Sequence, residues 1–123
     1  MNWMDMSLRD FQEALASNEP TPGGGTAAAV ALGQASALTQ MVAHLTLGNE
    51  KWKEGWVAAQ DAQLIVDKIS HRAGELAQLD SEAFDGVMDS FRMAKSTESE
   101  KKERRESIRN NTLLAAQIPY ETV

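Results

Sequence analysis

A proline- and glycine-rich loop ahead of an alanine-rich stretch constrains this chain more than any other feature of its sequence. Residues 20–26 read Pro-Thr-Pro-Gly-Gly-Gly-Thr. Each proline disfavours helix at the residue before it, so the loop must end any helix that precedes it. The residues from Thr26 to Leu47 are mostly apolar, and alanine is the commonest among them. This pattern predicts a long, closely packing helix that begins at the loop.

The rest of the chain also has helical periodicity, which predicts an all-α bundle of about five helices. Ser7 and Asp10 are spaced as a capping box for a first helix, and Thr97 and Glu100 for the last. Between them, the segment 52–93 has apolar residues at steps of three and four. It is either one helix with kinks at its glycines, Gly74 and Gly86, or two helices that meet near Asp80.

Composition and charge exclude several classes of function. The net charge is −6 and there is no cysteine, so neither sequence-independent nucleic-acid binding nor a thiolate metal site is expected. The first residues lack the basic and apolar regions of a signal peptide, which predicts a cytoplasmic protein. The stretch 26–47 is long enough to span a bilayer, but its polar residues favour a buried helix.

Small residues recur every four positions in the second expected helix, at Ala29, Gly33 and Ala37. Such a surface lets another backbone approach closely, and we expect it to help form at least a dimer. The apolar pattern of the last helix continues close to Val123. We therefore expect residues 1–123 to be a single helical domain that is truncated at its C-terminus.

The glycine-rich loop has two interpretations of equal weight. Three consecutive glycines before a helix expose backbone N–H groups to a ligand, and the helix N-terminus carries partial positive charge. The loop would then bind an anionic or carbonyl-bearing ligand. Alternatively, it is a tight connection where another backbone crosses. It is not a Walker A loop, because the lysine and the hydroxyl residue after it are missing.

Asp80 is the second residue of interest, because it lies on an apolar helical face. That face consists of Ile69, Ala73, Leu76, Asp80, Phe84, Val87 and Phe91. A carboxylate in this position is either half-buried and paired, or the N-cap of a new helix that starts at Ser81. Position alone favours the cap. The two histidines, His44 and His71, form no metal-binding pattern, so no catalytic metal is expected.

Three motifs in the same order resemble the formiminotetrahydrofolate cyclodeaminase and methenyltetrahydrofolate cyclohydrolase family. The loop and the alanines after it, residues 20–29, are similar to the signature loop of that family. Residues 80–95 are similar to its second motif, in which an aspartate precedes an Ala-Phe or Ala-Tyr pair, although Met93-Ala94 replaces the usual Leu-Pro. The charged helix that leads through Ala115-Ala116 to Pro119 is similar to a third feature.

The resemblance implies an all-helical, dimeric fold and a tetrahydrofolate substrate, with this chain as roughly the N-terminal three-fifths of a longer domain. Family members either expel ammonia from 5-formiminotetrahydrofolate to form a methenyl bridge or add water to that bridge. Neither reaction needs a metal or redox cofactor. By its match to the family's motif, Asp80 is implied to be catalytic. The residues implied in the same way to bind substrate are Pro22, Gly23, Gly24, Gly25, Thr26, Arg92 and Lys95.

These matches favour a role for Asp80 in acid–base catalysis over a role as a helix N-cap. Arg92, Lys95 and the basic residues of 101–105 are expected near the glutamate tail of the folate. A second hypothesis, from a different class, is a non-catalytic helical assembly module that keeps the fold without a complete active site. A cleft lined by both Asp80 and the glycine-rich loop would distinguish the enzyme from the assembly module.

Overall fold

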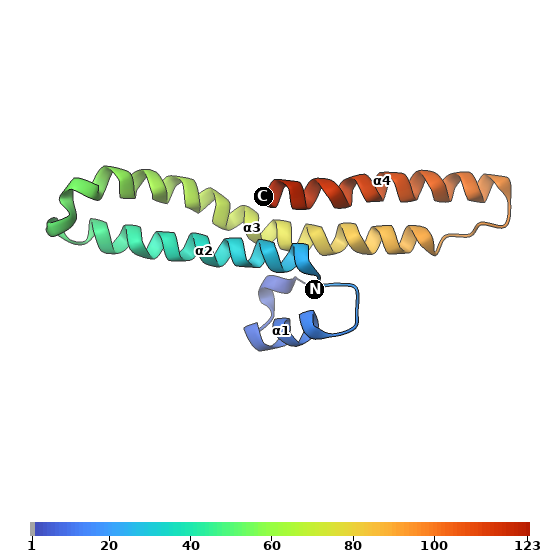
Figure 1. Cartoon of the computed structure of the whole chain (residues 1–123), viewed down its shortest axis with the longest axis horizontal. Coiled ribbons are helices and arrows are strands. Elements are labelled where there is room, and N and C mark those ends of the chain that lie inside the picture. The colour runs from blue at the N-terminus through green and yellow to red at the C-terminus, as the bar shows by residue number, and fades with distance from the viewer. Residues whose placement is uncertain (1) are drawn as a thin grey trace.

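The computed structural model describes residues 2–123, and within that range it contains four α-helices, two short 3-10 helices and no strand (Figure 1). In chain order these are η1 (Trp3–Asp5), α1 (Leu8–Ala16), α2 (Gly24–Leu47), η2 (Glu50–Gly55), α3 (Trp56–Phe91) and α4 (Glu98–Thr122). The predicted all-α class is confirmed, but the prediction of about five helices is wrong.

The longest helix, α3, is the axis on which the other long helices pack. Its 36 residues span about 54 Å. In Figure 1, α2 runs antiparallel along the first half of α3, and α4 runs antiparallel along the second half. The start of α2, the middle of α3 and the end of α4 therefore meet at one place. This junction contains a buried cluster of Ala29, Leu76 and Ala77. Val30 and Ile118 pack against the cluster.

Of the two alternatives for the segment 52–93, the one with two helices that meet near Asp80 is wrong, because α3 is continuous from Trp56 to Phe91. The two glycines that suggested kinks are instead points of close contact. A Cβ on Gly74 would lie 3.4 Å from Cγ of Met4, and one on Gly86 would lie 3.3 Å from Oδ1 of Asn111. Each glycine therefore lets a neighbouring segment approach α3 closely.

The helix ends follow the capping chemistry of the sequence. Ser7 accepts a hydrogen bond from the Asp10 N–H, and Thr97 accepts one from the Glu100 N–H, as predicted. The second helix ends at Leu47, immediately before Gly48. Within residues 2–123, none of the helices combines the length and the hydropathy that a bilayer span requires.

The small residues of α2 pack mainly inside the chain. Ala29 is fully buried, and a Cβ on Gly33 would lie 3.7 Å from the Cβ of Ala73 on α3. Ala37, the third member of this series, is exposed. The backbone that packs closely against Ala29 and Gly33 is thus that of α3 in the same chain.

Much of the remaining apolar surface has no partner in the described chain. The exposed large side chains of α2 are Leu38, Met41, Val42 and Leu45. The accessible surface is 8626 Å², whereas a compact monomer of 13.5 kDa exposes about 6500 Å². The structure therefore leaves an extended two-helix arm, the distal halves of α2 and α3, without a third layer over it.

Candidate functional site

The loop and Asp80, singled out independently in the sequence, line one cavity at the junction of the three long helices. The cavity has a volume of about 400 Å³. The residues that line it are Pro20, Thr21, Gly23, Gly24 and Gly25 from the loop and the start of α2, Asp80 and Phe84 from α3, and Ala115 and Pro119 from α4. A concave, largely apolar site with a single carboxylate suits the recognition of a small organic ligand.

Gly25 allows the Asp80 carboxylate to lie directly on the first turn of α2. A Cβ at this position would overlap the carboxyl group of Asp80. None of the glycines in the described chain has a positive φ, so Gly25 provides space here rather than an unusual backbone conformation. By contrast, a Cβ on Gly24 would meet no atom within 4 Å. The two neighbouring glycines therefore have different roles, one facing Asp80 and one facing open space.

The start of α2 has the features of an anion-binding helix terminus. Gly23 is the N-cap residue, and within the described chain no side chain caps this end of the helix. The N–H groups of the first turn are left without helical partners, and the helix dipole adds partial positive charge. This geometry fits the ligand-cradle interpretation of the loop, and it also places a positive potential beside Asp80.

Asp80 lies in the middle of α3 and is half-buried. The alternative that it caps a new helix is wrong, because the helix continues through it. Thr26 Oγ1 lies 3.3 Å from Asp80 Oδ2 and 2.9 Å from the Ala77 carbonyl oxygen. The half-buried, paired carboxylate is therefore the arrangement that the structure has.

Two of the residues expected to bind substrate lie behind the cavity rather than on its wall. Thr26 is fully buried, with its hydroxyl directed at α3. Pro22 is also buried, and the peptide bond that precedes it is cis. Gly23, Gly24 and Gly25 do line the cavity. Direct contact with a ligand is thus available to the glycines and not to the two residues that flank them.

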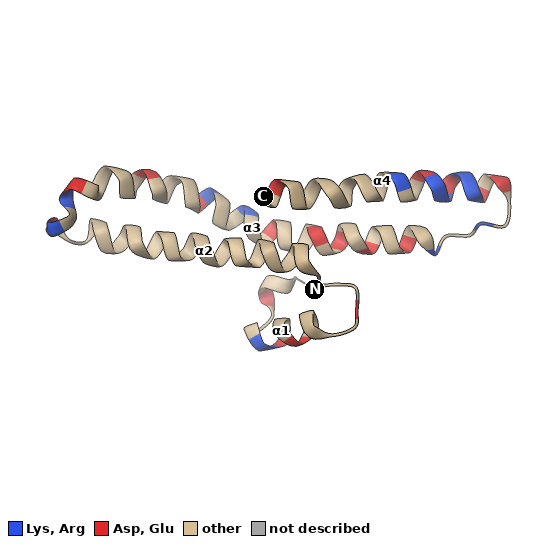
Figure 2. Cartoon of the chain, viewed as in Figure 1, with Lys and Arg blue, Asp and Glu red and all other residues tan. Residues whose placement is uncertain are grey.

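The basic residues expected near the glutamate tail lie far along the molecule. At 1.5 Å per residue, Arg92 is about 18 Å from Asp80 along α3, where it is exposed and paired with Asp89 at 3.2 Å. Lys95 is exposed in the connection to α4. Figure 2 shows the lysines and arginines of α4 gathered at the same end. None of these cations lines the cavity, so only the distal part of a long substrate would reach them.

Three cavity residues were noted in the sequence only as parts of wider patterns and not as site residues, namely Phe84, Ala115 and Pro119. Phe84 is one turn after Asp80, so helical spacing could have indicated it. Ala115 and Pro119 are also one turn apart, but their place on the wall depends on how α4 packs on α3. That packing includes a polar contact between Asn111 Nδ2 and Ser90 Oγ at 2.7 Å, which no sequence pattern indicates.

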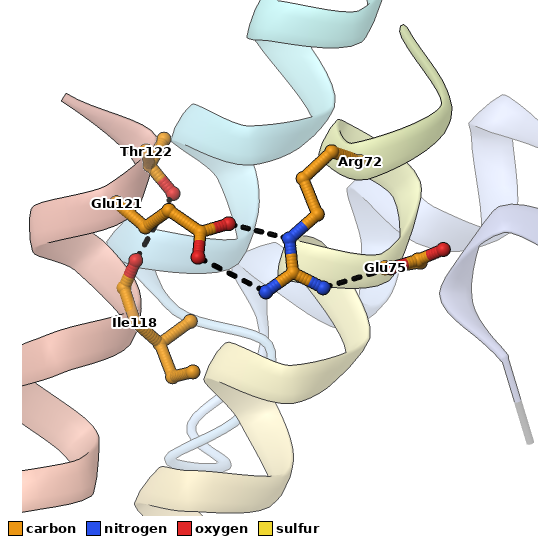
Figure 3. A network of polar contacts seen from close by, with 5 residues as sticks. All are labelled: Arg72, Glu75, Ile118, Glu121 and Thr122. Atoms are coloured by element: carbon orange, nitrogen blue, oxygen red, sulfur yellow. Dashed lines mark hydrogen bonds and ion pairs between the residues drawn. The ribbon is translucent and has the colours of Figure 1, made fainter. Parts of the chain in front are cut away.

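The last turn of α4 is also tied to α3 by an ion pair (Figure 3). Arg72 donates from two nitrogens to the Glu121 carboxylate and from a third to Glu75. These hydrogen bonds raise the pKa of Arg72, and the bond from Arg72 lowers the pKa of Glu121. The two side chains of the Arg72–Glu121 pair are 44% and 48% exposed, so the pair orients the helix end but adds little stability.

A second hollow, of about 550 Å³, lies between the distal halves of α2 and α3. Its lining residues are Gln40, His44, Gln60, Gln63, Leu64 and Asp67. Most of these side chains are exposed. Within residues 2–123 there is also no group of three or more His, Asp or Glu side chains that could hold a metal ion. The three-helix junction is therefore the stronger candidate site.

Comparisons with known proteins identify relatives over almost the whole chain. The family model described as formiminotransferase-cyclodeaminase matches residues 7–123. A methenyltetrahydrofolate cyclohydrolase of Methylorubrum extorquens is 34% identical over 116 residues, which cover 92% of this chain and 54% of the relative. The crystal structure of a formiminotetrahydrofolate cyclodeaminase from Thermotoga maritima superposes with a TM-score of 0.78 at 28% identity, covering 96% of this chain and 55% of that one. The chain thus spans about half the length of both proteins.

Proposed function

The chain belongs to the formiminotransferase-cyclodeaminase family, and on that premise we propose that it processes a tetrahydrofolate one-carbon derivative at the three-helix junction. The reaction is either release of ammonia from 5-formiminotetrahydrofolate or hydrolysis of 5,10-methenyltetrahydrofolate. The observation that carries the proposal is the cavity in which Asp80 lies against the glycine-rich start of α2. A cavity lined by both Asp80 and the glycine-rich loop favours the enzyme over a non-catalytic assembly module.

Asp80 is proposed to move the proton that the reaction requires. In cyclodeamination, N10 of the folate attacks the formimino carbon, and the tetrahedral intermediate loses its exocyclic nitrogen as ammonia. That nitrogen must be protonated as its bond to carbon breaks, and a carboxylic acid within reach can supply the proton. In hydrolysis, a carboxylate in the same position accepts a proton from the water that adds to the methenyl carbon. Neither route requires a metal or redox cofactor.

The glycine-rich start of α2 is proposed to hold polar groups of the folate through its free N–H groups. Gly24 offers the sharpest test, because a side chain there would enter open space beside the cavity. Gly24→Val is expected to weaken binding of tetrahydrofolate by about tenfold or more, while the melting temperature changes by no more than a few degrees.

The measurement is fluorescence or calorimetric titration with tetrahydrofolate, together with thermal unfolding of the same variant. Gly33→Val is not a suitable control, because Gly33 faces Ala73 on α3. Ala31→Val, at an exposed position of the same helix away from the cavity, is the matched control. If Gly24→Val lowers affinity only in proportion to a loss of stability, the loop is a packing turn and not a cradle.

We also propose that the protein forms a homodimer through the two-helix arm. The excess accessible surface is about 2000 Å² per chain, or about 4000 Å² for two chains, which lies within the range of total area that obligate homodimers bury. The exposed apolar side chains of α2 provide the matching chemistry. Sedimentation equilibrium is expected to give at least a dimer at micromolar concentration.

The same experiment on variants identifies the surface. The double variant Leu38→Lys, Leu45→Lys is expected to shift the protein to monomer, because it places two charges on the apolar face of α2. Gln12→Lys, at an exposed position of α1, adds a charge elsewhere and should leave the mass unchanged. A folded wild-type monomer at high micromolar concentration would rule out this assembly.

A further inference from the structure

The N-terminal segment contacts α3 directly beside Asp80. Trp3, in η1, donates its indole Nε1–H to Ser81 Oγ at 2.8 Å and its backbone N–H to Gln78 Oε1 at 3.1 Å. Ser81 follows Asp80 in the chain and is buried, with only 2% of its surface exposed. A residue far away in the sequence therefore determines the hydrogen bonding of the neighbour of Asp80.

The Ser81 hydroxyl in turn contacts Thr26. The two hydroxyl oxygens are 2.7 Å apart, and Thr26 is fully buried. Thr26 Oγ1 has two further neighbours, the Ala77 carbonyl oxygen at 2.9 Å and Asp80 Oδ2 at 3.3 Å. Trp3, Ser81, Thr26 and Asp80 are thus connected by consecutive hydrogen-bond contacts.

The donors in this chain of contacts follow from the chemistry of its members. An indole N–H can only donate, so Ser81 Oγ accepts from Trp3. If Ser81 also accepted from Thr26, its own buried proton would have no acceptor among its contacts, which is costly. The arrangement that pairs every proton has Ser81 donating to Thr26. The Thr26 proton is then left for either the Ala77 carbonyl or the Asp80 carboxylate.

We propose that Thr26 is a positioning residue for Asp80, held as a hydrogen-bond donor by the Trp3–Ser81 contact. When Asp80 is ionised, the Thr26 hydroxyl donates to Oδ2. When Asp80 carries a proton, the Thr26 hydroxyl turns to the Ala77 carbonyl and leaves the carboxylic acid free to face the cavity. Thr26 keeps its own proton throughout. The catalytic part of this inference rests on the function proposed for Asp80.

The effect on the reaction comes from the step in which Asp80 becomes a carboxylate. The O–H bond of Asp80 breaks as its proton passes to the departing nitrogen, and the electron pair stays on the carboxyl group. A donor already in place stabilises that charge without reorganisation. Removing the donor should slow this step, whereas substrate binding should change little, because Thr26 does not line the cavity.

The kinetic test compares Thr26→Val, which removes the hydroxyl at nearly constant volume, with Thr26→Ser, which keeps it. Thr26→Val is expected to lower kcat by about 10- to 100-fold, in line with a lost hydrogen bond to a charged group. KM should change by less than about threefold, and Thr26→Ser should restore most of kcat. Thr46→Val is the matched control, since the Thr46 hydroxyl donates to the Val42 carbonyl at the other end of α2, far from Asp80. Equal losses in the valine and serine variants would overturn the proposal.

Trp3→Phe tests the first contact, and its result in the wild-type background does not depend on whether Thr26→Val folds. It keeps an aromatic ring beside Phe11, whose ring centre lies 6.3 Å from that of Trp3, and removes the indole N–H together with one of the two fused rings. We expect kcat to fall by about three- to tenfold in the wild-type background. In the Thr26→Val background it should not fall further. An unchanged kcat in Trp3→Phe alone would overturn the role of the N-terminal segment.

A double-mutant cycle in unfolding tests the Thr26–Asp80 contact without any enzyme assay. Thr26→Val should raise the unfolding equilibrium constant in both backgrounds. The factor of increase should be about fivefold smaller in the Asp80→Ala background than in the wild type, because the shared hydrogen bond is already lost there. Additive effects would overturn the inference whether or not the protein is active. If the wild type converts neither folate substrate, the proposed function is wrong. The double-mutant cycle still tests whether Thr26 and Asp80 interact.

Discussion

Asp80→Asn is expected to lower turnover of the folate substrate by about 10²- to 10⁴-fold, the usual range for losing a general acid or base. The amide has the shape of the carboxyl group, and its oxygen can still accept the hydrogen bond from Thr26. It fills the same half-buried position on a continuous helix, so the fold should be retained. What the variant lacks is the transferable proton. Steady-state kinetics with either substrate measures the loss.

Asp61→Asn is the matched control for this substitution. Asp61 is exposed on the same helix, far from the cavity, so the control should keep wild-type turnover. Circular dichroism and thermal unfolding of both variants establish that folding is preserved. Turnover by Asp80→Asn within a factor of about three of wild type would show that the carboxyl group does not take part in proton transfer.

Gly25→Ala is expected to have the second largest effect, because one added methyl group overlaps the carboxyl group of Asp80. The carboxylate must move aside, and a displacement of about 1 Å in a catalytic group can cost about 10²-fold in rate. The backbone itself should accept alanine, because Gly25 lies in the first turn of α2 with a negative φ. Alanine also has the higher helix propensity, by about 1 kcal/mol.

The informative outcome for Gly25→Ala is therefore a protein that folds and has lost activity. Gly33→Ala makes the same chemical change in the same helix, where the new Cβ would meet Ala73 at an ordinary 3.7 Å. We expect the control to retain both stability and turnover. If Gly25→Ala is as active as Gly33→Ala, the position of the Asp80 carboxylate against α2 does not matter for catalysis.

The parts of the fold that could be predicted from the sequence are those governed by local chemistry. Ser7 and Thr97 cap helices where their spacing to Asp10 and Glu100 indicated. The glycine-rich loop opens α2, as its composition predicted. In each case the determining interactions lie within a few residues of one another, so a sequence pattern captures them.

The continuity of α3 could not be predicted in this way. Gly74 and Gly86 weaken a helix locally and suggested kinks, and the acidic Asp80 suggested, as the alternative, a break between two helices. The structure compensates with contacts from distant segments, including Met4 against Gly74 and Asn111 against Gly86. Tertiary packing thus decides the outcome at positions where local propensity alone would end the helix.

Within the candidate site, the glycine-rich loop and Asp80 could be predicted from the sequence, but the residues around them could not. The loop and Asp80 each have a residue type and a pattern that indicate chemistry. Ser81 and Trp3, by contrast, are unremarkable in the sequence, and their importance depends on a contact across 78 positions. The same holds for the wall formed by α4, which depends on the pairing of two helices.

The most direct test of the central claim follows the ultraviolet absorbance of 5,10-methenyltetrahydrofolate in the presence of this chain. Supplied with 5-formiminotetrahydrofolate, a cyclodeaminase makes the absorbance rise; supplied with the methenyl compound, a cyclohydrolase makes it fall. We expect the wild-type chain to accelerate one of these changes above the rate in buffer, and Asp80→Asn to remove the acceleration. Rates equal to those of buffer in both directions, from a folded wild-type protein, would contradict the account.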